Sequence, residues 1–204
     1  MKIAVIGAGS VGGTLGNAWG RRGHDVTYGV RSPNDEKYVA LGDVTTNDRA
    51  AAGADVVVLA TPWQATEEAV QSCGDLTGKV VVDCTNPLTP DATGLEVGHT
   101  SSGAEQVAGW APGARVCKAM NQIGAPMMDA PQLPGTPVMF VCGDDDAAKE
   151  VTAGLVRELG FEVVDGGDLA VARLLEPYAL IWIHLALRRG FGTNWGFGLL
   201  RRES

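Results

Sequence analysis

A glycine-rich turn near the start of the sequence limits the folds open to this chain. The apolar run Lys2–Ile6 has the character of a buried strand, and Val11–Arg22 has the pattern of a helix. Between them lies Gly7-Ala8-Gly9-Ser10-Val11-Gly12. In a dinucleotide-binding unit, the first glycine permits the tight turn, the second lets the backbone approach the pyrophosphate, and the third lets the helix pack against the strand. In this context, the turn predicts that free N–H groups at the start of the helix face phosphates.

The end of the next predicted strand, Asp25–Val30, indicates which dinucleotide binds. Enzymes that use NAD place Asp or Glu there, where it bonds the ribose 2′-hydroxyl. This chain has Arg31 and Ser32 instead. Arg31 can pair bidentately with a 2′-phosphate and Ser32 can add a hydroxyl, which favours NADP over NAD by about ten- to a hundredfold. The alternative is an exposed loop arginine without a ligand.

Apolar runs alternate with helical patterns through most of the chain. Val-rich runs typical of strands covered on both faces occur at Asp55–Ala60, Lys79–Asp83, Arg115–Ala119, Pro137–Cys142 and Phe161–Val164. Helices are expected at Trp63–Ser72, Ser101–Gly109 and Asp146–Leu159. This alternation predicts an α/β protein with a Rossmann-type doubly wound parallel sheet.

The last part of the chain differs from the rest. Residues 1–167 are expected to form the NADP-binding domain, and residues 168–204 a C-terminal helical extension packed on it. A long helix over Asp168–Arg189, bent by Pro177, has apolar residues on more than one face: Leu174, Leu175, Leu180, Ile181, Trp182 and Leu185. Such a helix needs burial on two sides, so we predict that one side packs on the sheet and the other on the second subunit of a homodimer.

The four arginines between Arg188 and Arg202 have no acidic residue among them. Arginine suits the C-terminal end of a helix dipole, so we expect a solvated helix end. The alternative is a dock for an anionic ligand.

Three further segments follow predicted strands: Ala60–Trp63, Asp83–Leu88 and Lys118–Ala125. Ligands gather at the carboxyl ends of the strands in such sheets, so these loops are candidates for the adenine side, the nicotinamide ribose and the carboxamide. Ordinary turns are the alternative, above all for Asn86 before Pro87. Lys118 is a weak candidate for a proton donor, or else a cleft residue bonded to backbone. Asn121 is a second weak candidate, or else a helix N-cap.

The sequence contains no recognisable acid–base machinery. No Ser-His-Asp order, paired catalytic carboxylates or metal cluster stands out, and Asp144–Asp146 are expected to cap a helix rather than to bind a metal. Of the histidines, His184 lies on the apolar helix and is expected to be packed. This pattern suits hydride transfer between two redox cofactors, which depends on proximity and orientation more than on a proton relay.

The net charge, the apolar runs and the cysteines limit the classes of partner and the cellular compartment that we expect. The net charge of −8 disfavours nucleic acid, which needs a basic face. The apolar run at the start ends at Gly7, too early for a signal peptide, and the apolar stretch Tyr178–Leu187 falls short of the roughly 20 residues that span a bilayer. Cys84, Cys117 and Cys142 lie at or beside apolar runs, as buried free thiols do. We therefore expect a cytoplasmic protein that acts on a small molecule, without a membrane partner.

Several stretches resemble the NADP oxidoreductases that use the deazaflavin coenzyme F420. They are Met1–Gly12, Tyr28–Ser32, Ala60–Trp63, Asp83–Leu88 and Lys118–Ala125, and the stretch Leu175–Ala186 is similar to bacterial members. The cytoplasmic domains of the STEAP metalloreductases resemble the chain more distantly. The resemblance covers nearly the whole chain, and its cofactor motifs are more specific for NADP than for the second substrate.

The resemblance implies positions for the cofactor. Ala8–Val11 would hold the pyrophosphate, Arg31 with Ser32 the 2′-phosphate, and Thr61-Pro62-Trp63 and Ile123-Gly124-Ala125 would flank the ribose and nicotinamide. It implies a hydride transfer between C4 of the nicotinamide and C5 of the stacked deazaflavin, without an obligatory side-chain acid. The chain departs from archaeal members at Asn121, where they carry a histidine.

Two other functions stay open on the sequence. One is an NADPH-dependent reductase of another acceptor, such as a flavin, a ferric chelate or a small carbonyl; carbonyl reduction would employ Lys118 as proton donor. The other is an NADPH-sensing protein without turnover.

Overall fold

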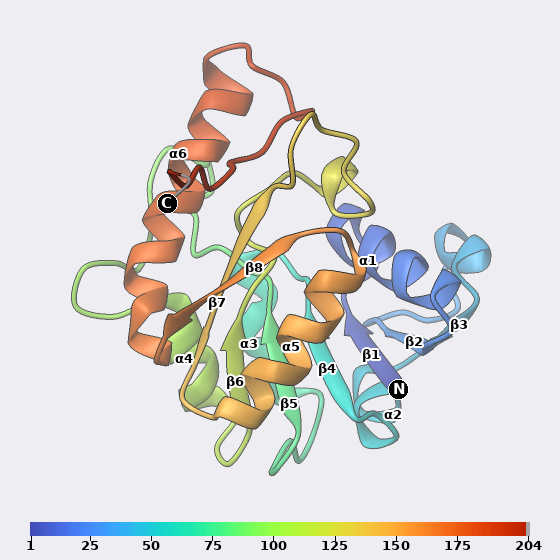
Figure 1. Ribbon diagram of the computed structural model, residues 1–204. Helices are drawn as coiled ribbons and strands as arrows, with labels where there is room; N and C mark the ends of the chain where they lie inside the picture. The colour runs from blue at the N-terminus through green and yellow to red at the C-terminus, as the bar shows by residue number, and fades with distance from the viewer. Residues whose placement is uncertain (203–204) are drawn as a thin grey trace.

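The computed structural model describes residues 1–202 and is built around one sheet of eight strands (Figure 1). The strands are β1 (Lys2–Ile6), β2 (Asp25–Gly29), β3 (Asp43–Thr45), β4 (Val56–Leu59), β5 (Val80–Asp83), β6 (Arg115–Lys118), β7 (Val138–Gly143) and β8 (Glu162–Gly167). Their order is β3-β2-β1-β4-β5-β6-β7-β8. Strand order reverses between β1 and β4, which is the arrangement of a doubly wound sheet. The predicted Rossmann-type fold is therefore confirmed.

One strand pair departs from the expected all-parallel sheet. β7 runs antiparallel to β6, while β7 and β8 are parallel to each other. The connection from β6 to β7 contains a short 3-10 turn, Ala125–Met127, and no α-helix. Without a crossover that returns the chain to the opposite edge, β7 starts near the edge where β6 ends and must run back.

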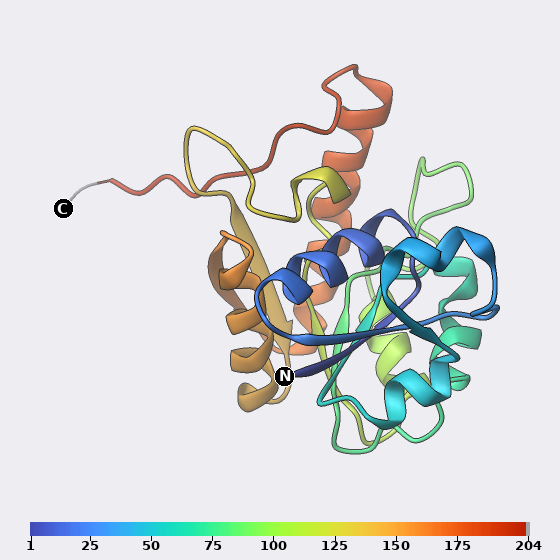
Figure 2. The same ribbon diagram turned by 90° about the vertical axis from the view of Figure 1, so that its right-hand side faces the viewer.

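Helices cover both faces of the sheet (Figures 1 and 2). Apolar side chains of α1 (Ser10–Arg21) and α5 (Asp146–Glu158) belong to one core cluster. Those of α2 (Asn47–Ala52), α3 (Thr66–Gln71), α4 (Gly103–Trp110) and α6 (Ala172–Arg188) belong to the other. Successive residues of β1 and β4 alternate between the two clusters, so these strands are buried on both sides, as their continuous apolar runs predict.

Two predicted helices have a different form. The helix expected at Trp63–Ser72 begins as a 3-10 turn, Trp63–Ala65, and becomes α-helical only in α3. Another 3-10 turn, Leu169–Val171, precedes α6. Within the acidic trio, Asp145 is the N-cap of α5, and its carboxylate accepts a hydrogen bond from the Ala148 amide at 2.7 Å. The capping expectation is confirmed.

α6 has one buried face and one exposed stripe. Ala172, Leu175, Ala179, Trp182 and Ala186 are buried. Leu174 and Ile181, 69% and 46% exposed, lie on the opposite stripe with Pro177 and His184. The expectation that His184 is packed is wrong for the single chain, because the residue falls on this exposed stripe. By length and composition, Leu169–Arg188 is able to cross a membrane, but the core helix of a soluble protein passes the same test.

The chain after α6 turns back along the helix and then extends away from the body (Figure 2). The Trp195 ring stacks on Trp182 at 5.3 Å between centroids, and the Phe197 carbonyl accepts a hydrogen bond from the Val138 amide at 2.9 Å. The arginines of this region do not form one cluster: Arg188 donates to the Asp91 carbonyl, and Arg201 pairs with Glu162.

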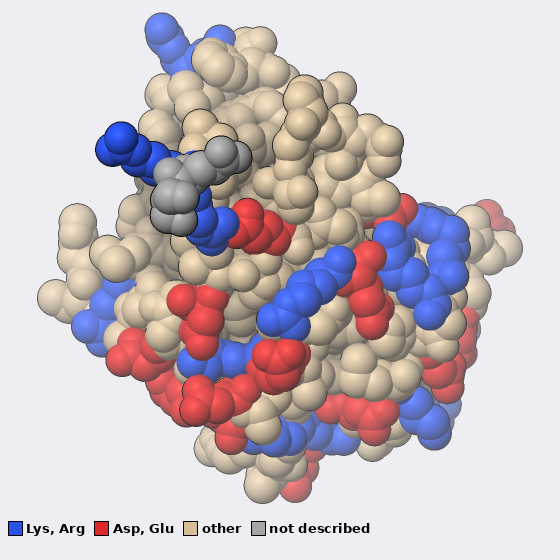
Figure 3. Space-filling view, in the orientation of Figure 1, with Lys and Arg blue, Asp and Glu red and all other residues tan. Residues whose placement is uncertain are grey.

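The distribution of charged side chains and the state of the cysteines agree with what the sequence predicts. Lys and Arg are interspersed with Asp and Glu on the face shown in Figure 3, and the upper part of that face is largely uncharged. All four cysteines, Cys73 included, are buried and free.

Candidate functional site

The glycine-rich turn connects β1 to α1, and its three glycines occupy three different surroundings. Gly7 has a φ of +97°, and a Cβ there would lie 2.6 Å from the Ala60 carbonyl oxygen. A Cβ on Gly12 would collide with the Gly7 carbonyl oxygen. A Cβ on Gly9 would have no heavy atom within 4 Å apart from those of its own neighbours along the chain. Gly7 and Gly12 therefore serve the protein's own packing, whereas the space beside Gly9 is open for a ligand.

The first turn of α1 carries no side-chain cap. Gly9 is its N-cap residue, and the turn contains no acidic residue. In contrast, Ser102 caps α4 and Asp145 caps α5. Unpaired N–H groups and the positive end of the helix dipole favour an anion at the start of α1.

A first cavity of about 540 Å³ lies beside this turn, at the carboxyl ends of β1 and β2. Arg31 and Ser32 line it, as do Lys37, Asp48 and Glu68. Arg31 is exposed and donates from Nη2 to Glu68 Oε2 at 2.8 Å. The structure therefore places the predicted pair, Arg31 and Ser32, on one cavity with Gly7 and Ala8.

A second cavity of about 410 Å³ shares Thr61 with the first. The loops after β4 and β5 form much of its wall together with the start of α1; its predicted lining residues are Gly9, Ser10, Val11, Thr61, Pro62, Trp63 and Asn86. Within residues 1–202 the lining includes no Asp, Glu, His, Lys or Arg. Its one thiol, Cys84, is buried, and burial raises its pKa far above neutrality. No lining side chain is thus suited to exchange a proton near neutral pH.

Three predicted cofactor residues line neither cavity: Gly12, which packs against the Gly7 carbonyl, Ile123 and Ala125. Ile123 is buried in the core cluster that contains α1 and α5, and Ala125 packs against the same cluster. The segment of Ile123 and Ala125 follows β6, which lies further from β1 in the sheet than β4 and β5 do.

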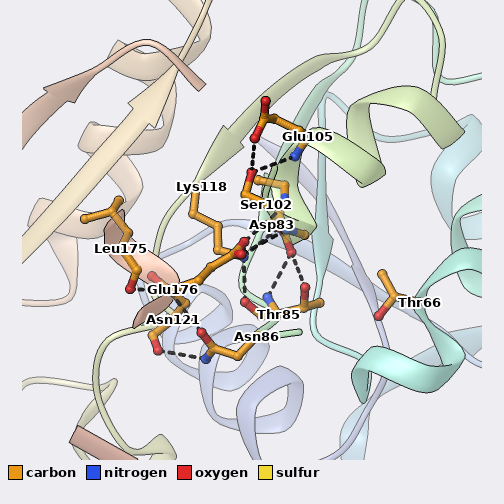
Figure 4. Close-up of polar contacts among 12 residues, drawn as sticks. Thr66, Asp83, Thr85, Asn86, Ser102, Glu105, Lys118, Asn121, Leu175 and Glu176 are labelled. Atoms are coloured by element: carbon orange, nitrogen blue, oxygen red, sulfur yellow. Dashed lines mark hydrogen bonds and ion pairs between the residues drawn. The ribbon is translucent and has the colours of Figure 1, made fainter. Parts of the chain in front are cut away.

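Lys118, at the end of β6, lies in a fully buried charge cluster (Figure 4). Its ammonium is 2.8 Å from Asp83 Oδ2 and 2.9 Å from Glu176 Oε1, and it donates to the Thr85 carbonyl at 2.6 Å. Burial lowers the pKa of Lys118, but the two carboxylates outweigh it, so the pKa is raised above its ordinary value. The geometry favours the alternative interpretation of Lys118, a residue bonded to backbone, over that of a proton donor, because the ammonium is enclosed and lines neither cavity.

The charge cluster joins four elements. Glu176, from α6, also accepts hydrogen bonds from the Gly103 and Ala104 amides at 2.9 and 3.1 Å, at the start of α4. Asp83 Oδ1 accepts from the amide and the hydroxyl of Thr85 at 2.9 and 2.7 Å, which fixes the loop that lines the second cavity. No role was predicted for Glu176, although a glutamate within an apolar helix pattern is a signal in the sequence.

Asn121 and Asn86 hold two loops together. Asn86 donates from Nδ2 to the Asn121 carbonyl at 2.9 Å, and Asn121 donates from Nδ2 to Asn86 Oδ1 at 3.1 Å. Asn121 is buried and caps no helix, because the next turn begins at Ala125 with Gly124 as its N-cap. Asn86, but not Asn121, lines the second cavity.

The chain resembles known proteins over almost its entire length. The family model described as "NADP oxidoreductase coenzyme F420-dependent" matches residues 2–87. An F420-dependent NADP reductase of Methanothermobacter thermautotrophicus is 32% identical, over 92% of this chain and 90% of the relative. The metalloreductase STEAP3 of Rattus norvegicus is 29% identical over 88% of this chain, which spans only 36% of that relative.

Solved structures agree with the fold. The crystal structure of a putative F420-dependent NADP-reductase from Arthrobacter sp. FB24 has a TM-score of 0.90 and 34% identity, covering 98% of this chain and 100% of that one. A reductive aminase from Aspergillus terreus, solved with NADPH4, has a TM-score of 0.68 at 23% identity and shares the fold; 93% of this chain matches 62% of the aminase.

Proposed function

Because this chain belongs to the family of coenzyme F420-dependent NADP oxidoreductases, we propose that it transfers a hydride between NADP(H) and the deazaflavin F420. The observation that supports this reaction is the second cavity. It adjoins the glycine-rich turn, and the described residues that line it include no acid or base suited to neutral pH. Hydride transfer between two ring cofactors needs close, aligned rings rather than a side-chain proton donor.

The residues of the first cavity suit the adenosine half of NADP(H). In this proposal Gly9 leaves room for the pyrophosphate at the uncapped start of α1. Arg31 and Ser32 take the 2′-phosphate, and Gly7, Ala8 and Gly12 shape the turn beneath it.

The residues of the second cavity suit the nicotinamide half. Thr61, Pro62, Trp63 and Asn86 would orient the ring, together with Ser10 and Val11. We propose that Ile123 and Ala125 support this wall from the core rather than touch the cofactor.

The bound nicotinamide would supply two electrons and a hydrogen as a hydride at C4. The protein's part is to bind, to orient and to exclude water from the apolar wall formed by Pro62, Trp63 and Leu88. Reduction of the acceptor also consumes one proton, and solvent must supply it, because no lining side chain is suited to do so.

A second candidate reaction is NADPH-dependent reduction of another acceptor. The 29% identity with a protein named a metalloreductase favours a ferric chelate in this role. A third candidate is a protein that binds NADPH without turnover, and the experiment described next distinguishes all three. We further propose a cytoplasmic location, which suits four buried free thiols.

The test is an anaerobic mixture of the purified protein, NADPH and oxidised F420, followed by deazaflavin absorbance. Bleaching at catalytic protein concentration is the expected result. The control is NADPH binding, measured separately by nucleotide fluorescence. Binding without bleaching would overturn the F420 reaction, and the same mixture with a ferric chelate or a flavin would then separate the second candidate from a binding protein.

A further inference from the structure

The mouth of the first cavity carries an ion pair that stands where the 2′-phosphate is proposed to bind. Arg31 follows β2, Glu68 lies on α3, and both line the cavity. Their charged atoms are 2.8 Å apart, and their side chains are 73% and 69% exposed.

The described residues that line this cavity include two cations, and each already has a carboxylate partner. Arg31 pairs with Glu68, and Lys37 pairs with Asp35 at 2.7 Å. An incoming phosphate therefore meets no unpaired cation among them. The phosphate can bind Arg31 bidentately only if the Glu68 carboxylate moves away from the guanidinium.

We propose that Glu68 is a specificity-determining residue: its carboxylate competes with the 2′-phosphate of the cofactor for Arg31 and so reduces the preference for NADP(H) over NAD(H). The inference rests on the proposed role of Arg31. NAD(H) lacks the phosphate, so it binds without separating Arg31 from Glu68. Removal of the Glu68 carboxylate should therefore leave the affinity for NAD(H) unchanged.

The exposure of the pair makes this competition mild. An ion pair in solvent contributes little, because water and salt screen it and two long side chains must be ordered. A phosphate dianion makes stronger charge-assisted bonds to arginine, so it displaces the carboxylate. Glu68 consequently tunes the cofactor preference without abolishing NADPH binding.

The first experiment compares Glu68→Gln with Glu67→Gln. Glu67 is the preceding residue of α3, bonds Gln71 at 3.1 Å and does not line the cavity, so its variant removes the same charge from the same helix. Dissociation constants for NADPH and NADH are measured by nucleotide fluorescence at low and high salt. We expect Glu68→Gln to bind NADPH about three- to fivefold more tightly, with NADH within about twofold of wild type and a smaller NADPH effect at high salt. Glu67→Gln should leave both within about twofold.

The second experiment places Glu68→Gln in an Arg31→Ala background. Competition for Arg31 requires that the gain in NADPH affinity disappears there. A gain that persists in full would overturn the competition, as would weaker NADPH binding by Glu68→Gln or identical behaviour of the two glutamine variants. Failure of the proposed role of Arg31 has a different signature, because Arg31→Ala alone would then weaken NADPH and NADH equally. Failure of the F420 reaction is distinct from both, because NADPH would still bind while F420 would not be bleached.

Discussion

At the scale of single residues, position decides which side chains the site tolerates. Gly12 and Gly13 are neighbours in the first turns of α1, but only the Cβ of Gly12 would strike backbone, at the Gly7 carbonyl. A Cβ on Gly13 would meet Leu41 at 3.9 Å, an ordinary contact. Adjacent glycines thus differ in whether the fold requires them.

We predict opposite effects for alanine at these two positions. Gly12→Ala should lower the free energy of unfolding by at least about 2 kcal/mol, because α1 must move away from β1. Gly13→Ala should raise it by about 0.5–1 kcal/mol, since alanine is the better helix former. Urea denaturation of both variants checks this. Equal destabilisation would mean that helix packing against the turn is not the constraint.

Lys118 is a second position where a single side chain has a large effect on the free energy of unfolding. Lys118→Met should lower the free energy of unfolding by about 3–5 kcal/mol, because it leaves Asp83 and Glu176 as buried carboxylates without their cation. The control is Lys149→Met at a surface cluster with Asp146 and Asp165, where we expect a loss of at most about 1 kcal/mol.

A charge-balancing variant sharpens that experiment. Asp83→Asn added to Lys118→Met should recover at least about 1 kcal/mol, because it removes one of the two stranded carboxylates and keeps Oδ1 as the acceptor for Thr85. No recovery in urea denaturation would show that the loss comes from packing rather than from charge.

At the scale of elements, α4 and α6 are joined by polar contacts in addition to their apolar core. Ser102 caps α4 and accepts from the Glu105 amide, while Glu105 in turn receives a fork of hydrogen bonds from Arg173 of α6. Glu176 supplies the carboxylate for the two preceding amides of α4. The start of α4 is therefore completed by residues that come about 70 positions later.

This link makes part of the stability depend on pH. The hydrogen bonds from Arg173 hold the pKa of Glu105 below its ordinary value, with burial opposing and Ser102 assisting. A lowered folded-state pKa stabilises the protein above the unfolded pKa and loses that contribution as pH falls through the folded value. Arg173→Met should thus cost about 0.5–1 kcal/mol at pH 7 and progressively less as the pH falls.

Urea midpoints of wild type and Arg173→Met at pH 7, 5 and 3 test that expectation. Arg157→Met, which removes the exposed pair with Glu150, is the control and should show a small loss. A difference between wild type and Arg173→Met that stays constant across pH would contradict the role of Glu105.

The elements also show how far the sequence predicts the structure. Strands β1, β4 and β5 were predictable because their apolar runs follow directly from burial on both faces. No element was predicted between Ser32 and Asp55, where the structure has a 3-10 turn (Glu36–Leu41), β3 and α2. These are too short for a periodic pattern: β3 has three residues and α2 has six.

For the candidate site, local chemistry was predictable and distant pairing was not. The glycine turn and Arg31 stand out because their neighbours in sequence define their context. The partners Glu68 of Arg31 and Glu176 of Lys118 are set by the fold, 37 and 58 positions further along the chain. The antiparallel direction of β7 follows from a missing crossover helix, which the apolar pattern of the strand itself does not report.

At the scale of the whole molecule, α6 presents a stripe of apolar side chains to solvent in the single chain. Leu174 and Ile181 lie two turns apart on one side of the helix, and Leu187 and Phe191 near its end are each 63% exposed. Exposed apolar residues in series favour an interface.

We therefore predict a homodimer that uses this stripe of α6. Light scattering at micromolar concentration should give twice the chain mass, and Leu174→Lys with Ile181→Lys should give the single chain mass with the fold retained by circular dichroism. The control is Val39→Lys, an 83% exposed apolar residue on the 3-10 turn Glu36–Leu41, which should leave the mass unchanged. A single chain mass for the wild type would contradict the prediction, and a dimer that survives both lysines would place the interface elsewhere.

The buried charge cluster also constrains how the chain is completed during synthesis. Asp83 and Lys118 belong to strands at the centre of the sheet, but the carboxylate that accepts the α4 amides is residue 176 of 204. While the ribosome still holds the last helix in its exit tunnel, the first half of α4 has no acceptor for two amides, and the sheet carries a lysine that lacks one of its counter-ions. The charge cluster therefore cannot form completely until α6 is free to fold. Emergence of α6 from the tunnel becomes the step that completes the charge cluster, so a nascent chain stalled before α6 would be a substrate for chaperones and proteases.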